Sequence, residues 1–174
     1  MNHDLKYGLM LGIINVLINA SIIMIDYTLL TSALWVSFIN VAITISILLI
    51  AGFKLRSERD GVLPFKEAFL STWLIIVIAG FLSTVYSIVQ YNVLTPELPA
   101  LIQDSIVNET ATLLQNFGAD DQTIDEAVAE LRAENSFSVN NLLESFLYTS
   151  ILGGAVLAAI LGLIVKKNPT PEFR

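Results

Sequence analysis

Four long apolar runs alternate with short polar or charged blocks along the chain. The runs cover residues 7–25, 29–53, 68–91 and 142–165. Each reaches or exceeds the roughly 18–20 residues that a helix needs to cross a hydrocarbon core about 30 Å thick. The pattern therefore predicts an all-α protein, a four-helix transmembrane bundle that forms one membrane domain over residues 1–174.

The longest polar block, residues 92–141, is expected to form helices of its own. Apolar residues recur near helical spacing over 98–117, and Gly118 follows as a C-cap. A second helix is predicted to begin at Thr123, whose hydroxyl can cap the first turn while Glu126 reaches back in a capping-box pattern. The block therefore predicts a helical hairpin outside the cytoplasm, between the third and fourth spans.

Lysine and arginine are unevenly distributed between the two sides of the predicted bundle. Eight of the nine lie before the first run, between the second and third, or after the fourth, and only Arg132 lies in the 92–141 block. Basic residues next to a span resist translocation, so both termini are predicted to be cytoplasmic. An even number of spans also places both termini on one side. The same block holds nine of the sixteen acidic residues, which concentrates negative charge on the outer side.

Small and polar residues recur on one helical face of every apolar run. They are Gly8, Gly12, Asn15 and Asn19 in the first run, Ala33, Ser37, Asn40 and Thr44 in the second, Gly80, Ser83, Ser87 and Gln90 in the third, and Ser150, Gly154, Ala158 and Gly162 in the fourth. Small residues let backbones approach closely in lipid, and amides and hydroxyls hydrogen-bond between helices. These faces are therefore predicted to be helix-packing seams.

The polar seam residues also allow a second interpretation. Asn15, Asn19, Asn40 and Thr44 would line a path for a small polar solute if they faced a common cavity. Packing is the favoured interpretation, because no acid or base lies near the middle of a run to carry protons. A tightly packed interior would support packing, whereas a water-filled cleft lined by the three asparagines would support permeation.

Glu144 is the only charged residue inside the boundary of a predicted span. It lies one turn from the outer edge, where its side chain can reach the lipid head groups. The alternative is a polar pair inside the bundle, with Gln90 or Asn92 at the end of the neighbouring span as its partner. Glu144 and Gln90 are therefore candidates for an intramembrane or interfacial polar site.

The sequence offers little equipment for catalysis or for binding a cofactor. It contains no cysteine, and its one histidine, His3, is expected to be a solvated side chain of the N-terminal tail. It carries no metalloprotease, serine-hydrolase, phosphate-loop or dinucleotide motif. We therefore expect a non-enzymatic protein with no cofactor and no metal, and the net charge of −7 argues against binding nucleic acid.

Two short motifs resemble an uncharacterised membrane family. Residues Pro64–Phe69 read PFKEAF, and after a long apolar run residues Tyr91–Glu97 read YNVLTPE. Both are similar to the family known as domain of unknown function 4199, found mainly in Bacteroidota. The resemblance also takes in Gly8–Gly12, the acidic block and the glycine-rich last run. It implies a four-span inner-membrane protein of a bacterium with two membranes, and it brings no activity, cofactor or catalytic residue.

These patterns together favour a membrane scaffold or interaction protein. Its expected partners are membrane lipids, a second copy of the chain, and another membrane or periplasmic protein that docks on residues 98–137. The alternative is a small-solute or ion permeation protein, formed as an oligomer because four spans leave little room for a cavity within one chain. An enzyme is the least favoured class.

Overall fold

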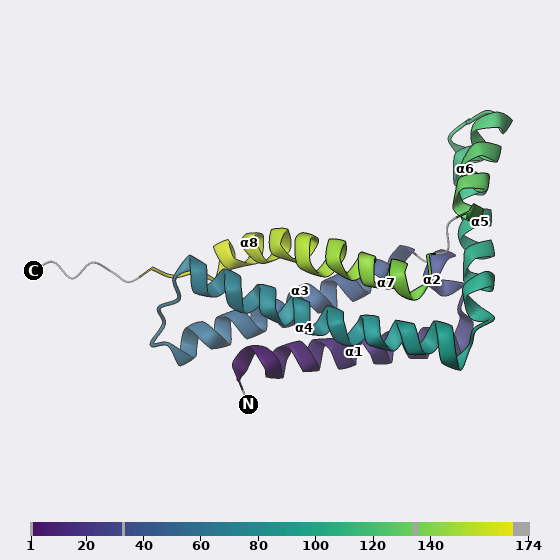
Figure 1. The fold of residues 1–174 in the computed structure, drawn as a ribbon. Helices are drawn as coiled ribbons and strands as arrows, with labels where there is room; N and C mark the ends of the chain where they lie inside the picture. The colour runs from purple at the N-terminus through teal and green to yellow at the C-terminus, as the bar shows by residue number, and fades with distance from the viewer. Residues whose placement is uncertain (1, 33, 134–135, 169–174) are drawn as a thin grey trace, which may run out of the picture.

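The computed structural model describes residues 2–32, 34–133 and 136–168, and its regular elements there are all helices (Figure 1), which confirms the all-α prediction. In chain order they are α1 His3–Asp26, α2 Leu29–Ser32, α3 Leu34–Glu58, α4 Phe65–Val89, η1 Gln90–Leu94, α5 Leu98–Asn116, α6 Asp121–Ala133, α7 Val139–Phe146, η2 Leu147–Gly153 and α8 Gly154–Val165, where η marks a π-helix. Ala33, assigned above to a packing seam, lies outside the described residues.

Four helical segments are long and apolar enough to cross a membrane. They are His3–Asp26, Trp35–Glu58, Phe65–Leu94 and Val139–Val165, and four such helices indicate a multi-pass membrane protein. The second begins later than predicted, and the chain turns directly after α1. The Asp26 carboxylate accepts hydrogen bonds from the backbone N–H and the hydroxyl of Thr28, at 2.9 and 2.7 Å. Residues 29–32 then form the separate helix α2.

The bundle has two distinct ends (Figure 1). The start of α1, the end of α8 and the α3–α4 loop lie at one, which we call the terminal end, and α2, α5 and α6 lie at the other. We call residues 98–133, which comprise α5 and α6, the arm, and the end that carries them the arm end. Figure 1 shows the arm crossing the bundle and projecting beyond it, with α6 beside the distal part of α5.

Helix α4 is central, and α1 approaches it through two glycines. A Cβ added to Gly8 would lie 2.7 Å from the Cβ of Ile78. A Cβ added to Gly12 would lie 2.9 Å from Leu82 Cδ2 and 3.2 Å from Ala79 Cα. Real Cβ atoms essentially never come within 3.0 Å of such atoms, so a larger residue at Gly8 or Gly12 would force the neighbouring atoms to shift. This half of the first seam therefore packs α1 directly on α4.

Helix α8 approaches the other side of α4 in the same way. A Cβ on Gly154 would lie 2.8 Å from Ile76 Cγ2, and one on Gly162 would lie 3.2 Å from the backbone nitrogen of Phe69. Ala158, between these glycines, is completely buried. Gly154, Ala158 and Gly162 therefore form one continuous contact strip against α4.

The π-helix η2 continues this contact towards the arm end. Gly80 of α4 lies directly against Ser150, so a Cβ at position 80 would overlap the Ser150 hydroxyl. The indole N–H of Trp73, seven residues before Gly80 on α4, donates to the carbonyl oxygen of Ile151, the residue after Ser150, at 3.0 Å. A π-helix is wider than an α-helix and often marks a local constraint, and here it lies where α4 offers a glycine.

Helix α3 packs through its C-terminal half only. Ile47, Leu48 and Ala51 are buried in the core, whereas Trp35 and Val41 are more than half exposed. The seam predicted for this span is therefore not a packing strip along its whole length. Its residues nearest the arm end stand away from the bundle, with Ser37 exposed and Asn40 and Thr44 half-buried.

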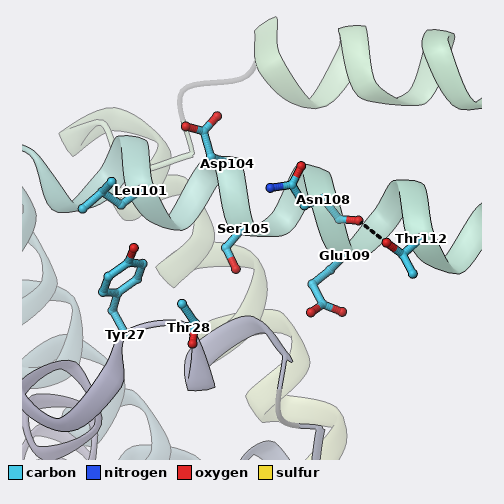
Figure 2. Close-up of a pocket in the computed structure, with 8 residues that line it drawn as sticks. All are labelled: Tyr27, Thr28, Leu101, Asp104, Ser105, Asn108, Glu109 and Thr112. Carbon is cyan, nitrogen blue, oxygen red and sulfur yellow. Dashed lines mark hydrogen bonds between the residues drawn. The ribbon is translucent and has the colours of Figure 1, made fainter.

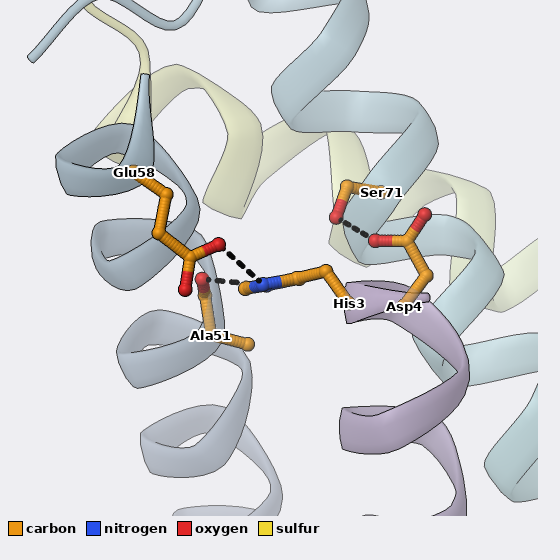
Figure 3. A network of polar contacts seen from close by, with 5 residues as sticks. All are labelled: His3, Asp4, Ala51, Glu58 and Ser71. Atoms are coloured by element: carbon orange, nitrogen blue, oxygen red, sulfur yellow. Dashed lines mark hydrogen bonds and ion pairs between the residues drawn. The ribbon is translucent and has the colours of Figure 1, made fainter. Parts of the chain in front are cut away.

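His3 and Asp4 fasten the start of α1 to its neighbours at the terminal end (Figure 3). The Nε2 atom of His3 lies 3.1 Å from the carbonyl oxygen of Ala51, and its Nδ1 lies 3.3 Å from Oε2 of Glu58, both on α3. Asp4 accepts a hydrogen bond from the hydroxyl of Ser71 on α4. The expectation of a solvated tail histidine was wrong, because helix α1 begins at His3 and carries its ring into the bundle.

The α3–α4 loop and the residues that follow α8 also meet at the terminal end. The backbone N–H groups of Leu63 and Lys167 each donate to the other's carbonyl oxygen at 2.8 Å, and Leu63 is completely buried. The guanidinium of Arg56 donates to the carbonyl oxygen of Val165 at 3.1 Å, which satisfies a free carbonyl at the end of α8. The α3–α4 loop is thereby tied to the end of the last span.

The arm is attached to the bundle by an apolar cluster at the base of α5. Leu98 and Ile102 are buried with Tyr91, against partly buried residues that include Ile23 and Tyr27 of the first span and its turn. Further out, the Gln103 side chain donates to the carbonyl oxygen of Leu131 at 2.6 Å and so joins α5 to α6. The base of the arm is therefore fixed, and its distal part rests mainly on itself.

The turn between α5 and α6 confirms one predicted cap and corrects another. Gly118 has a φ of 78° directly after α5, which confirms it as the C-cap glycine. Helix α6 begins at Asp121, not at Thr123. Its cap is Asp120, which accepts the backbone N–H of Thr123 at 2.8 Å, and this hydrogen bond with that of the Thr123 hydroxyl lowers the pKa of the Asp120 carboxyl.

The adjacent glycines Gly153 and Gly154 provide a matched test of the packing on α4. Gly154→Leu should lower the free energy of unfolding by about 1–3 kcal/mol, because the new side chain collides with Ile76. Gly153→Leu should change it by less than about 0.5 kcal/mol, since a Cβ there meets nothing closer than 3.4 Å and the position is exposed. Thermal melting in detergent measures both, and equal losses would contradict the packing.

Asp120 should make the start of α6 sensitive to acid. A carboxyl with a lowered pKa in the folded state stabilises the fold above its unfolded pKa, and this contribution is lost as pH falls through the folded pKa. Hydrogen exchange should therefore show the first turn of α6 opening in acid. Asp120→Ala should open it at neutral pH, whereas Asp120→Asn keeps a capping side chain without the pH dependence. An acid-insensitive wild-type turn would refute this account.

Candidate functional site

A polar hollow lies between α1, α3 and α4 in the half of the bundle nearest the arm. Its volume is about 180 Å³, and it is lined by Asn15, Val16 and Asn19 of α1, Asn40 of α3, and Ser83, Tyr86 and Ser87 of α4. Six of these seven side chains carry a hydrogen-bonding group. The hollow therefore collects, from three separate spans, the polar residues that the sequence places on helical faces.

Three buried atoms at this hollow have no hydrogen-bond partner among the described residues. They are Oδ1 of Asn15, Oδ1 of Asn19 and the hydroxyl oxygen of Tyr86. The rest of the Asn19 side chain is within hydrogen-bonding reach of Tyr91. Because an unpaired polar group costs of order several kcal/mol away from water, these atoms favour the presence of a polar partner in the hollow.

A second, mostly apolar hollow adjoins the first. It has a volume of about 270 Å³ and shares Asn19 and Asn40 with the polar hollow. Its other lining residues are Ile18 and Ile22 of α1, Leu30 of α2, and Val36, Ser37 and Val41 of α3. We call the two hollows together the asparagine cleft. It offers hydrogen-bonding groups on one side and apolar surface on the other.

The asparagine cleft does not continue to the terminal end. Below it, Leu11 of α1, Leu48 and Ala51 of α3 and Ile75 of α4 form a core in which each side chain is at most 1 % exposed. Tyr7 closes the next layer and is also buried. Within one chain the cleft is therefore a site that ends near the middle of the bundle.

The course of the chain explains why the cleft is open. The turn at Asp26 and Thr28 leads into the short helix α2, and α3 follows it as a separate helix. Ile43 and Ile45 of α3 pack against the bundle core and Ile47 is buried in it, whereas Trp35 and Val41 nearer the arm end are more than half exposed. Asn15, Asn19 and Asn40 therefore face the cleft, which α4 lines on a third side.

A further hollow lies beneath α5, outside the bundle core (Figure 2). It has a volume of about 330 Å³, and its lining includes Tyr27 and Thr28 on the bundle side and Asp104 and Glu109 on α5. Figure 2 also shows Thr112 of α5 facing it, with its hydroxyl donating to the Asn108 carbonyl oxygen at 2.8 Å. This hollow separates the projecting arm from the α1–α2 turn and is negatively charged on the arm side.

The candidate polar pair of Glu144 with Gln90 or Asn92 does not form. The Gln90 amide is buried and donates to the hydroxyl of Thr95 at 2.9 Å, which closes the turn after η1. The Asn92 amide donates to the carbonyl oxygens of Ile88 and Phe137. Glu144 itself is exposed. The two amides are occupied by local backbone and side-chain partners, so they cannot draw the carboxylate inward.

The described residues do not form a metal site. In residues 2–32, 34–133 and 136–168, no three acidic or histidine side chains lie close enough together to hold a metal ion.

Tyr86 lines the polar hollow, although the sequence analysis did not select it for a seam. Its position three residues after Ser83 and one before Ser87 puts it on the same helical face, and that spacing was the available signal.

A family model described as "Protein of unknown function (DUF4199)" matches residues 6–167. The chain belongs to this family. The match extends from the first turn of α1 to the backbone bridge after α8, so it takes in all four apolar spans, the asparagine cleft and the arm. No curated protein and no solved structure matches the chain. Membership in the DUF4199 family agrees with the resemblance seen in the sequence and supplies no activity.

Proposed function

We propose that this DUF4199 protein is a non-enzymatic interaction protein of a bacterial cytoplasmic membrane, and that the arm is its docking surface. The observation that carries the proposal is the projection of the arm beyond the bundle (Figure 1). A four-span bundle needs only a short turn between its third and fourth spans, and loops well beyond about 12–15 residues usually carry function or their own structure. The arm has its own structure and extends past what it could cover.

The surface at the tip of the arm supports a basic partner. Phe117 is 85 % exposed and Leu113 is 50 % exposed, at the turn between α5 and α6. Asp120, Asp121 and Asp125 surround this turn in sequence and are also exposed. Apolar anchors within an acidic rim favour a partner that presents apolar side chains among lysines or arginines.

The proposed orientation places both termini in the cytoplasm and the arm on the opposite side. The basic residues nearest the spans, including Lys6, Lys54, Lys66 and Lys166, belong to the segments gathered at the terminal end. The arm has Arg132 as its only basic residue. This asymmetry supports retention of the terminal end on the cytoplasmic side. A helix that crosses the arm end then lies along the outer membrane–water boundary.

Permeation of a small polar solute is the second candidate function, and the asparagine cleft is the observation that favours it. Asn15, Asn19 and Asn40 do line one open cleft. The packed layer formed by Leu11 and Leu48 lies across the continuation of any such path. A conducting form would therefore need either movement of α3 or a pathway between copies of the chain, so we rank it below docking.

The orientation has a direct test with fused reporters. A reporter that is active only outside the cytoplasm should be active when inserted at Gly118 and silent when inserted at Gly61 or fused after Arg174. Gly61 and Gly118 are both turn residues with positive φ, at 80° and 78°, and a Cβ at either would meet nothing within 4 Å, so the insertions are matched. Activity at Gly61 would overturn the proposed orientation.

Docking can be tested without disturbing the base of the arm. The double substitution Leu113→Ser and Phe117→Ser should abolish crosslinking to neighbouring proteins in native membranes while leaving the melting temperature within about 2 °C, because both side chains are exposed. Ala129→Ser, at an exposed position of α6, is the matched control. If every crosslinked neighbour survives the double substitution, the tip of the arm is not the docking surface.

A further inference from the structure

We infer that the asparagine cleft binds one neutral lipid alcohol from the bilayer. Its hydroxyl groups would pair with the asparagine side chains in the polar hollow, and its hydrocarbon chain would lie in the adjoining apolar hollow. This inference is independent of docking on the arm, because the cleft and the tip of the arm share no residue.

The charge of the ligand follows from the lining of the cleft. Neither hollow is lined by Lys, Arg, Asp or Glu. A phosphate or ammonium group placed there would lose its hydration without meeting an opposite charge, which costs far more than amides and hydroxyls return. The cleft therefore selects against charged phospholipid head groups and for an uncharged one.

The kind of polar group follows from the unpaired atoms. Oδ1 of Asn15 and Oδ1 of Asn19 are acceptors, so their partner must donate hydrogen bonds. A lipid with two hydroxyl groups can donate one hydrogen bond to each amide oxygen and can also accept one from the hydroxyl of Tyr86. Esters and quinones offer acceptors only and would leave both amide oxygens unpaired. The hydrogen-bonding pattern therefore selects an alcohol.

The size and position of the two hollows fit a lipid. About 180 Å³ in the polar hollow equals roughly six times the ~30 Å³ that one water molecule occupies in the liquid, which suits a head group as small as glycerol. The apolar hollow beside it is lined by Ile18, Ile22 and Val41, among others. Val41 is 54 % exposed on the outward side of α3, so a chain can enter sideways from the hydrocarbon region.

The packed layer beneath the cleft would keep a bound lipid in the cleft. A ligand that enters between α1 and α3 meets Leu11 and Leu48, each 1 % exposed, and can go no further towards the terminal end. Leaving again requires the hydroxyl groups to break their bonds to the amides inside hydrocarbon. Binding with slow release is therefore expected, without transfer across the membrane.

The test uses the full-length protein in phosphatidylcholine nanodiscs doped with one defined lipid at a time. The probes are 1-monooleoylglycerol, which has two hydroxyl donors, a polyprenol, which has one, and the 2,3-diacetyl ester of monooleoylglycerol, which has the same chain without a hydroxyl donor. We expect one molecule of an alcohol to be retained in native mass spectrometry. At about 100 times its Kd it should raise the melting temperature by roughly 5–10 °C. Comparison of the two alcohols distinguishes a glycerol lipid from an isoprenoid one.

Two substitutions assign the binding to the cleft. Asn19→Leu removes the amide shared by both hollows, and Tyr86→Phe removes one hydroxyl and keeps the ring, so each should weaken retention at least about tenfold, the factor that corresponds to one lost hydrogen-bonding group. Ser46→Ala is the control, since Ser46 is exposed on α3 outside the cleft and bonds only the carbonyl of Ala42. Equal stabilisation by the diacetyl ester, retention of neither alcohol, or unchanged binding by both cleft variants would each overturn the inference.

Discussion

Close approach of backbones to α4 is the constraint on which the rest of the bundle depends. Lipid chains are as apolar as leucine, so helices inside a membrane gain nothing by merely hiding apolar side chains from their surroundings. They must gain from dispersion contacts at short range, and Gly12 on one side of α4 and Gly154 on the other provide them. Helix α3 brings a close contact only near its end, where Gly52 lies against Val165. It is therefore the helix free to diverge.

That divergence links the packing to the cleft. In a fully closed bundle, Asn15 and Asn19 would find partners on α3, as polar seam residues usually do. Here the first turns of α3 line a hollow and do not pack tightly on α1, so amides placed for helix packing become the lining of an open site. Seam residues thus pack against a neighbouring helix at one end of the seam and line a binding cleft at the other. Which of the two they do depends on the distance to the neighbouring backbone.

The sequence predicted the spans and the glycine contacts well because both depend on local properties. Length and hydropathy determine whether a helix can cross a bilayer, and spacing determines which glycines share a face. The turn after Asp26 was predicted, and it is formed by the Asp26 carboxylate bonding Thr28. The separation of α2 from α3 was missed because Leu29 and Leu30 are as apolar as the span that follows. The π-helix at Leu147–Gly153 was also missed, and it lies where Gly80 of α4 contacts Ser150.

The residues of the candidate site could be predicted from the sequence, but the open cleft that they line could not. The faces with Asn15, Asn19 and Asn40 were evident from periodicity, but whether they met a neighbour or a cavity depended on how far α3 leans from the bundle. Likewise, Glu144 looked able to reach Gln90 by sequence position, yet Thr95 lies only five residues from Gln90 and occupies its amide first. Short-range partners prevail because little chain entropy is spent in bringing them together.

The backbone bridge between Leu63 and Lys167 has a consequence for how the protein is made. Synthesis delivers α1, α3 and α4 to the membrane before α8 exists, so the α1–α4 pair can assemble while the other side of α4 still faces lipid. The buried backbone of Leu63 acquires its partner only when the last span has been inserted. A nascent chain that stalls before that point would leave unpaired peptide groups at the membrane edge. These unpaired peptide groups would be exposed and could be recognised by proteases that degrade incomplete membrane proteins.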